Sequence, residues 1–317
     1  MASINKDSTP KGKGTKITPV VYSEVPNTHV SNMPSTLTYN DKLYCFHQGE
    51  YNYGALWYNV WDGVTWEGDK QAPSTALSSG PSAVLFKDKI YVFFQGPKND
   101  TTIWYNVLDP STSEWKGATE LKGKHMTANP SAVVWNGEIY VYHQGWSDHK
   151  LWYLTFDGSE PGSDTVVAPN IDIYEGPSAV VFKDSVYIFY QGGKTTTWYH
   201  TIDSAGKAQD VKVETTWTTS SPGAVVSHER IFLFHHDNGG ANTLYLNIMT
   251  DTGSSFVWSG DEQVEGVKLD SGPSAAVLYD NIHCFHQLHG TPKLYFASFA
   301  QSTKTSDSHQ DPGSGRR

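Results

Sequence analysis

Short hydrophobic runs with alternating polar positions recur along the whole chain, separated by polar turns. In "SAVLFKDKIYVFFQG" (82–96), two apolar runs flank the polar turn "KDK", which is the pattern of a β-hairpin. A variable polar loop follows, and then a third apolar segment such as "IWYNVLD" (103–109). A looser fourth strand is expected after it, around Thr65–Gly68 in the first unit. Because long helix-forming runs are few, the pattern predicts an all-β protein.

This unit occurs six times, at intervals of 45 to 51 residues. Twelve residues after the proline that opens each unit stands an aromatic residue, and two residues further stands Gln, except at His236. Four strands in a repeat of this length are typical of a β-propeller blade. The opening prolines are Pro34, Pro81, Pro130, Pro177, Pro222 and Pro273.

The two ends of the repeat region complement each other. The sixth unit stops after its third strand, Leu294–Ala300, whereas Ile17–Ser23 resembles the fourth strand of the other units. We predict that the N-terminal strand completes the last blade, which closes the ring and removes two open sheet edges. The predicted fold is therefore a six-bladed β-propeller of four-stranded antiparallel blades over residues 17–300. Residues 1–16 and 301–317 are polar and are predicted to be flexible tails.

Composition excludes several classes of function. The net charge of −10 argues against a nucleic-acid partner, which requires clustered Lys and Arg. No apolar stretch is long enough for a signal peptide or for membrane insertion, so a cytoplasmic protein is expected, with unconventional secretion and a homo-oligomer left open. Cys45 and Cys284 occupy equivalent positions in neighbouring blades, where symmetry turns their side chains the same way, so two buried, unpaired thiols are predicted.

Candidate chemistry gathers on one face. In a propeller, the loop that enters strand one and the loop that joins strands two and three open on the same side, and the second of these varies most between the units. No cofactor is expected, and no metal site, because the adjacent strand residues His235 and His236 point to opposite faces of their sheet. The candidate ligand-binding residues are His47, Gln48, Tyr51, Tyr53, Gln95, His143, Gln144, Trp146, Tyr190, Gln191, His286 and Gln287.

Structural alternatives stay open for most of these residues. A recurring Gln can tie the backbone of a neighbouring segment, and the varying residue before it can form an inter-blade packing wall. The recurring indoles are assigned to the core, and the aspartates after strand three are assigned to turns. The indoles are Trp57, Trp104, Trp152 and Trp198.

The units built on "PSAVLFKDKIYVFFQG" and "IWYNVLD" resemble the blades of β-propeller lectins, and "YNVWDGVTWEGD" (58–69) is similar to the strand–turn–strand of six-bladed fucose-binding lectins. The resemblance implies a multivalent, non-catalytic carbohydrate-binding protein with glycans or glycoconjugates as partners and up to six inter-blade pockets. In that family an Arg and a Glu hold the sugar; here the blades carry only Arg230, so Gln, His, aromatic and backbone groups would have to replace them.

Two other functions stay open, and one is excluded. Six-bladed sialidases require an arginine triad, which a single blade arginine cannot form. The alternatives to a lectin are a protein-interaction scaffold and, as a more remote one, a hydrolase with its site in the central channel.

Overall fold

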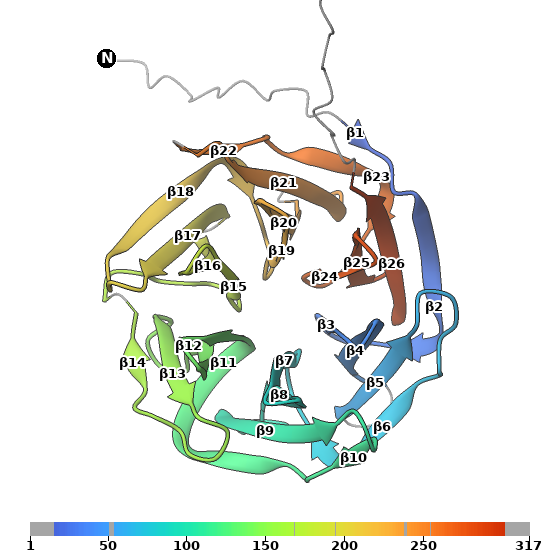
Figure 1. Ribbon diagram of the computed structural model, residues 1–317, viewed down its shortest axis with the longest axis vertical. Helices are drawn as coiled ribbons and strands as arrows, with labels where there is room; N and C mark the ends of the chain where they lie inside the picture. Colours follow the sequence, from blue (N-terminus) through green and yellow to red (C-terminus); the bar gives the residue numbers. More distant parts are fainter. Residues whose placement is uncertain are drawn as a thin grey trace, which may run out of the picture.

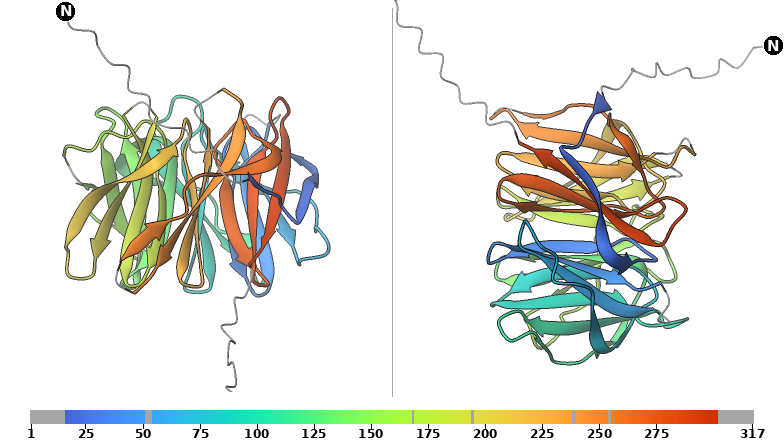
Figure 2. Two further views of the ribbon diagram at one scale, coloured as in Figure 1. Left: turned by 90° about the horizontal axis from the view of Figure 1, so that it is seen from above. Right: turned by 90° about the vertical axis from the view of Figure 1, so that its right-hand side faces the viewer.

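The chain forms a ring of antiparallel blades around a central axis (Figure 1). The computed structural model describes residues 16–50, 54–167, 169–193, 195–237, 240–253 and 255–301. This part of the chain contains strands and no helix, so it holds no helix that could cross a membrane. The strands of each blade run between two opposite faces of the ring (Figure 2). The predicted all-β propeller is confirmed.

The first three blades follow one another along the chain. The long strand β11 bends from the outer position of the second blade into the inner position of the third, so these two blades form one continuous sheet. The first blade consists of β3 (Ser35–Tyr39), β4 (Lys42–Gln48), β5 (Ala55–Trp61) and β6 (Lys70–Ala76). The second and third consist of β7 (Ser82–Phe86), β8 (Lys89–Gln95), β9 (Thr102–Asp109), β10 (Glu114–Trp115), β11 (Thr119–Trp135), β12 (Glu138–Gly145), β13 (Leu151–Phe156) and β14 (Thr165–Val166).

The other three blades complete the ring. Short strands are added to the fifth blade, where β1 pairs with β23 in parallel. The fourth blade consists of β15 (Ser178–Phe182), β16 (Ser185–Gly192), β17 (Thr196–Asp203) and β18 (Ala208–Trp217). The fifth and sixth consist of β19 (Gly223–Ser227), β20 (Arg230–His236), β21 (Thr243–Asp251), β22 (Phe256–Trp258), β23 (Glu262–Lys268), β24 (Ser274–Leu278), β25 (Asn281–Gln287) and β26 (Lys293–Ala300), with β1 (Lys16–Ile17) and β2 (Val21–His29) from the N-terminal side.

The N-terminal segment closes the last blade, as predicted. Strand β2 pairs with β26, with Val21 opposite Ser298 and Glu24 opposite Tyr295. The closing strand begins at Val21 and not at Ile17, because Ile17 pairs with Val264 in the fifth blade. The predicted tails lie outside the described residues except for Lys16 and Gln301.

The fourth strand of the first blade was placed wrongly. Thr65–Gly68 belongs to the turn in which Trp66 bridges back to Trp61, and the strand itself is β6, which begins at Lys70. The stacked rings of Trp61 and Trp66, with centroids 5.5 Å apart, pack against Phe296 of the sixth blade. The apolar pattern at 65–68 therefore reflects inter-blade packing by a turn.

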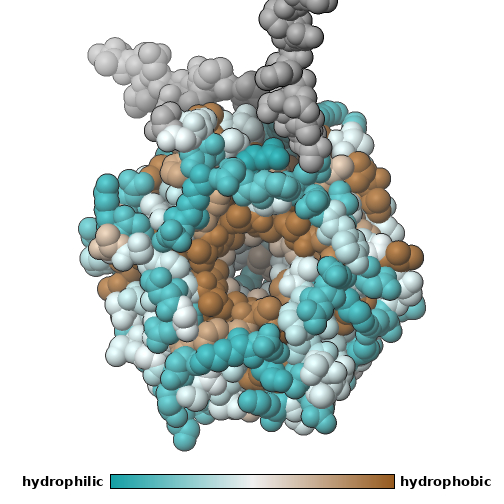
Figure 3. All heavy atoms as spheres, viewed as in Figure 1, coloured by the Kyte–Doolittle hydropathy of each residue, from teal (hydrophilic) through white to brown (hydrophobic). Residues whose placement is uncertain are grey.

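The core lies between adjacent blades. The aromatic residue twelve positions after each opening proline is fully or almost fully buried, and apolar clusters join each blade to the next. Cys45 and Cys284 are buried free thiols, as predicted, and burial raises the pKa of each. Hydrophobic residues also surround the central opening when the ring is viewed along its axis (Figure 3).

A belt of serines joins the inner strands. In each of the blades that contribute to this belt, a serine follows the opening proline, and its hydroxyl oxygen accepts a backbone N–H from the inner strand of the next blade. The distance from Ala83 N to Ser35 Oγ, for example, is 2.9 Å. The same bond recurs at four further interfaces, through Ser82, Ser131, Ser178 and Ser274. The fifth blade carries Gly223 at this position, so the contact between the fifth and sixth blades has no such hydroxyl.

Candidate functional site

The loop-rich face is organised by the recurring glutamines. Their backbone carbonyls accept N–H groups of the segment that enters the same blade; Ser78 N to Gln95 O, for example, is 3.2 Å. Ser31, Tyr174 and Asp270 make the same bond to Gln48, Gln191 and Gln287. The loop that enters strand one and the end of strand two therefore share one face, as predicted.

An open pocket of about 240 Å³ lies between the second and third blades on this face. The second blade contributes Gly123 and His125 from β11. The third blade contributes the end of β12, the loop that follows it, Trp152 of β13 and the residue before β14. Its side-chain chemistry comes from His125, His143, Trp146, Asp148, Trp152 and Asp164.

The side chains of this pocket are held by short contacts. Asp148 accepts the backbone N–H of Lys150 at 3.0 Å and the indole N–H of Trp152 at 3.2 Å, which fixes the loop against β13. The imidazole of His143 is buried, with Nε2 2.9 Å from Asp164 Oδ1. Trp146, in contrast, is 54% exposed, and its ring centroid lies 5.9 Å from that of His125.

The same His–Asp contact occurs in alternate blades. In the first, third and fifth blades, the residue thirteen positions after the opening proline is His, and an aspartate at the start of the outer strand lies within hydrogen-bond distance of it. Phe94 takes the His position in the second blade, where the register places Ala118 at the Asp position. In the sixth blade His286 stands at this position without an aspartate contact among the described residues, so His alone does not specify the pair. The three pairs are His47–Asp69 (2.9 Å), His143–Asp164 (2.9 Å) and His235–Asp261 (3.1 Å).

An Asn–Thr hydrogen bond joins neighbouring blades at three other interfaces but is missing between the second and third blades. Asn106 of β9 donates from Nδ2 to Thr75 of the preceding blade at 2.7 Å, and its Oδ1 accepts two backbone N–H groups of its own blade. Asn59 and Asn247 make the same bond to Thr28 and Thr216. Between the second and third blades, Leu154 stands at the Asn position and Lys124 at the Thr position, so this tie is absent. The Asp164 carboxylate consequently faces an open groove.

Most of the predicted glutamines are engaged with the protein. Gln48 donates to Leu77 O at 2.8 Å and accepts from Asn32 at 2.9 Å. Gln144 accepts from Thr127 at 2.7 Å and donates to the carbonyl of Ile173. Gln95 and Gln287 each donate to a carbonyl of the loop that follows them, and Gln191 is buried. These contacts favour the structural interpretation of the glutamines.

The other predicted residues are distributed over several grooves. Of the predicted residues that the structure describes, His143 and Trp146 line the pocket, whereas His47, Tyr190 and His286 are buried in other blades. Burial and the nearby Asp210 raise the pKa of Tyr190. Tyr51 and Tyr53 lie outside the described residues.

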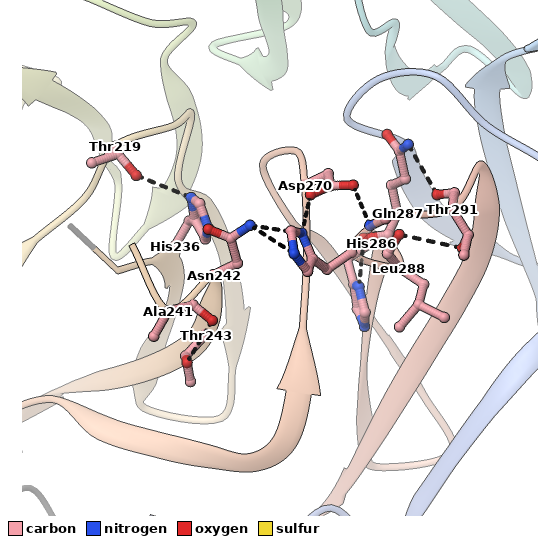
Figure 4. Close-up of polar contacts among 12 residues, drawn as sticks. Thr219, His236, Ala241, Asn242, Thr243, Asp270, His286, Gln287, Leu288 and Thr291 are labelled. Carbon is pink, nitrogen blue, oxygen red and sulfur yellow. Dashed lines mark hydrogen bonds and ion pairs between the residues drawn. The ribbon is translucent and has the colours of Figure 1, made fainter. Parts of the chain in front are cut away.

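A second polar cluster joins the loops of the fifth and sixth blades (Figure 4). Thr219 Oγ1 lies 3.0 Å from Nδ1 of His236, and Asn242 Nδ2 lies 2.6 Å from Nδ1 of His289, which also pairs with Asp270. Burial lowers the pKa of His236. In the described part of the chain no three His, Cys, Asp or Glu side chains are grouped to hold a metal ion, and these contacts instead tie one loop to the next.

The aspartates that follow strand three are turn residues. Asp62 Oδ1 accepts the N–H groups of Val64 and Thr65 at 2.8 and 2.6 Å, and these bonds lower the pKa of Asp62. Asp109, Asp157, Asp203 and Asp251 accept backbone N–H groups in the same way. Their recurrence is explained by the turn.

The central channel offers little chemistry. Met33, Asn129 and Ser221, from alternate blades, converge at its mouth on the loop-rich face, where Asn129 Nδ2 lies 3.3 Å from Ser221 Oγ and 3.5 Å from Met33 Sδ. The cavity there, of about 100 Å³, is lined by Pro, Ser, Ala, Thr, Gly, Met and Asn among the described residues, with no titratable side chain. A hydrolytic site would need an acid–base pair, which these residues do not supply.

Comparison with known proteins supports the fold. No family model matches the sequence, and no curated protein matches it either. Among solved structures, a triple arginine-to-alanine mutant of AofleA from Arthrobotrys oligospora is 14% identical, with a TM-score of 0.70 over 89% of this chain and 87% of that one. An asparagine-to-glutamine mutant of Aleuria aurantia lectin in complex with α-methyl-L-fucoside is 16% identical, with a TM-score of 0.62 over 87% and 94% of the two chains.

A sialidase shares the same fold. The Trypanosoma rangeli sialidase in complex with the inhibitor DANA is 13% identical, with a TM-score of 0.62 over 91% of this chain, which spans 58% of that protein. Identities this low establish the propeller fold alone, and the predicted resemblance to propeller lectins is confirmed at that level. Because lectins and a sialidase share the fold, function has to be argued from the site.

Sequence reasoning missed four of the six side chains that give the pocket its chemistry. Trp152 was assigned to the core because it recurs, and His125 belongs to the preceding blade. Asp148 and Asp164 lie in stretches that vary between the units. A usable signal was present, since an aspartate follows the His at 47, 143 and 235 by 22, 21 and 26 residues.

Proposed function

We propose that this protein is a non-catalytic, carbohydrate-binding lectin whose best-formed site is the pocket between the second and third blades. The observation that carries the proposal is the combination of an exposed indole, Trp146, with the carboxylates Asp148 and Asp164 in one open inter-blade pocket. Such a pocket can stack the apolar face of a pyranose ring and accept hydrogen bonds from its hydroxyl groups.

Repetition of the blade supports multivalent binding. The second blade repeats part of the site, because Asp100 Oδ2 accepts the indole N–H of Trp104 at 2.9 Å as Asp148 does from Trp152. Weak single sites gain avidity when several of them engage one glycan-coated surface. Agglutination by the wild-type protein would therefore be stronger than its affinity for a single sugar suggests.

Replacing Trp146 with Ala is expected to weaken binding of the best glycan at least about tenfold, roughly 1.4 kcal/mol, because the stacking surface is lost. The glycan would be selected on a glycan array, and its affinity measured by surface plasmon resonance. Val64→Ala truncates another exposed apolar side chain, 88% exposed in a turn on the opposite face, and should leave the affinity unchanged. Absence of binding by the folded wild-type protein across a broad array would refute the proposed function.

A further inference from the structure

Two aspartates line the pocket between the second and third blades, and the other titratable side chains among its described lining residues are His125 and His143. Asp148 and Asp164 both face it, and no Lys or Arg is among the described residues that line it. Carboxylates carry a negative charge at neutral pH, and the whole chain has a net charge of −10. An acidic sugar would meet repulsion here, whereas a positively charged ligand would be attracted.

Two side chains of the pocket wall that can donate hydrogen bonds, Trp152 and His143, are already engaged with protein oxygens. The indole N–H of Trp152 points to Asp148, and His143 faces oxygen atoms on both sides, Asp164 Oδ1 at 2.9 Å and Gln144 O at 3.3 Å. The Asp164 side chain remains 22% exposed, and its second oxygen makes no hydrogen bond within the described part of the chain. The second oxygen of Asp164 is therefore an acceptor that a donor group of the ligand can reach.

An exposed indole adds a second preference for a cation. Trp146 is 54% exposed beside these carboxylates. The face of an indole attracts ammonium groups and also stacks on the apolar face of a sugar ring. The pocket, at about 240 Å³, is smaller than a drug-sized site, which matches a single ring.

We propose that this pocket binds an amino sugar whose amine is free and protonated, with the ammonium group directed to Asp164 and the ring over Trp146. The inference rests on the proposed carbohydrate-binding function and adds the class of sugar. Glucosamine units in a deacetylated oligosaccharide have this chemistry, and N-acetylation removes the charge while keeping the ring.

The decisive comparison is between a glucosamine trimer and an N-acetylglucosamine trimer, titrated calorimetrically into the full chain at pH 6 and low salt. We expect the glucosamine trimer to bind at least tenfold more tightly, and its advantage to shrink when salt screens the charges. Asp164→Asn should remove most of this advantage. Asp88→Asn is the matched control, because Asp88 lies in a hairpin turn on the opposite face with φ of 56°, which Asn also adopts readily.

The outcomes separate the two proposals. If both trimers bind equally and Trp146→Ala weakens both, the protein is a lectin but the amino-sugar inference is overturned. If choline or lysine binds as tightly as the glucosamine trimer, the pocket recognises ammonium groups in general, which also overturns it. If folded protein binds neither trimer nor any glycan on the array, the proposed function fails as well.

Discussion

Gly223→Ser is expected to destabilise the fold by about 3 kcal/mol, although five of the six blades carry Ser at this position. A Cβ atom at Gly223 would lie 2.2 Å from the carbonyl oxygen of Pro273, which is backbone and cannot swing away. The inner strands of the fifth and sixth blades therefore approach more closely than the serine belt permits. The free energy of unfolding from urea denaturation measures the effect.

Ser178→Gly provides the matched comparison for this substitution. It removes one hydroxyl that accepts Ala224 N at 2.9 Å, and so should cost about 1 kcal/mol for the lost hydrogen bond. If Gly223→Ser were neutral or stabilising, the close approach of the fifth and sixth blades would be disproved. If a steric clash governs position 223, Gly223→Ser should lower the free energy of unfolding more than Ser178→Gly does. If only the missing hydrogen bond mattered, Gly223→Ser should instead raise it.

The inner three strands of each blade were predictable because they pack against the neighbouring blades. Burial requires apolar residues at fixed positions, and the aromatic residue twelve positions after each proline marks one of them. The outer strand has no such constraint, since it lies at the edge of its sheet. In β6 the sequence "KQAPSTA" contains Pro73 and little alternation, which sheet edges tolerate, so its position could not be read from the pattern.

The candidate site was only half predictable for a related reason. His143 and Trp146 were found because they sit in or next to a repeated phrase, but the pocket also needs side chains from a neighbouring blade and from a loop of variable length. The missing polar tie in this groove involves two residues that come from different blades. Leu154 and Lys124 replace the Asn and Thr that join the blades at other grooves. This replacement can be recognised only when the strand register is known.

The second large expected effect concerns His286, whose burial should make the fold less stable as the pH is lowered. Its imidazole is buried between blades, stacked on Tyr22 at 5.9 Å, and burial lowers its pKa to about 4. In the unfolded chain the imidazole of His286 has a pKa near 6.5. Between pH 6.5 and 4 the unfolded state therefore binds more protons at His286 than the folded state does. The contribution of neutral His286 is therefore complete above pH 6.5 and is lost as the pH falls toward 4. A shift of this size corresponds to about 3 kcal/mol.

His286→Phe is expected to remove that part of the acid sensitivity. Phe94 occupies the equivalent position in the second blade, and the Gln287 carbonyl that His286 contacts keeps its bond from Asp270 N at 3.2 Å. The variant should match the wild type near pH 7.5 and exceed it in unfolding free energy by about 2–3 kcal/mol near pH 4.5. Urea denaturation at a series of pH values measures the difference directly. Parallel pH profiles for the two proteins would show that the buried imidazole is not responsible, and that other groups with lowered pKa, such as His283 and Glu67, set the acid limit of the fold.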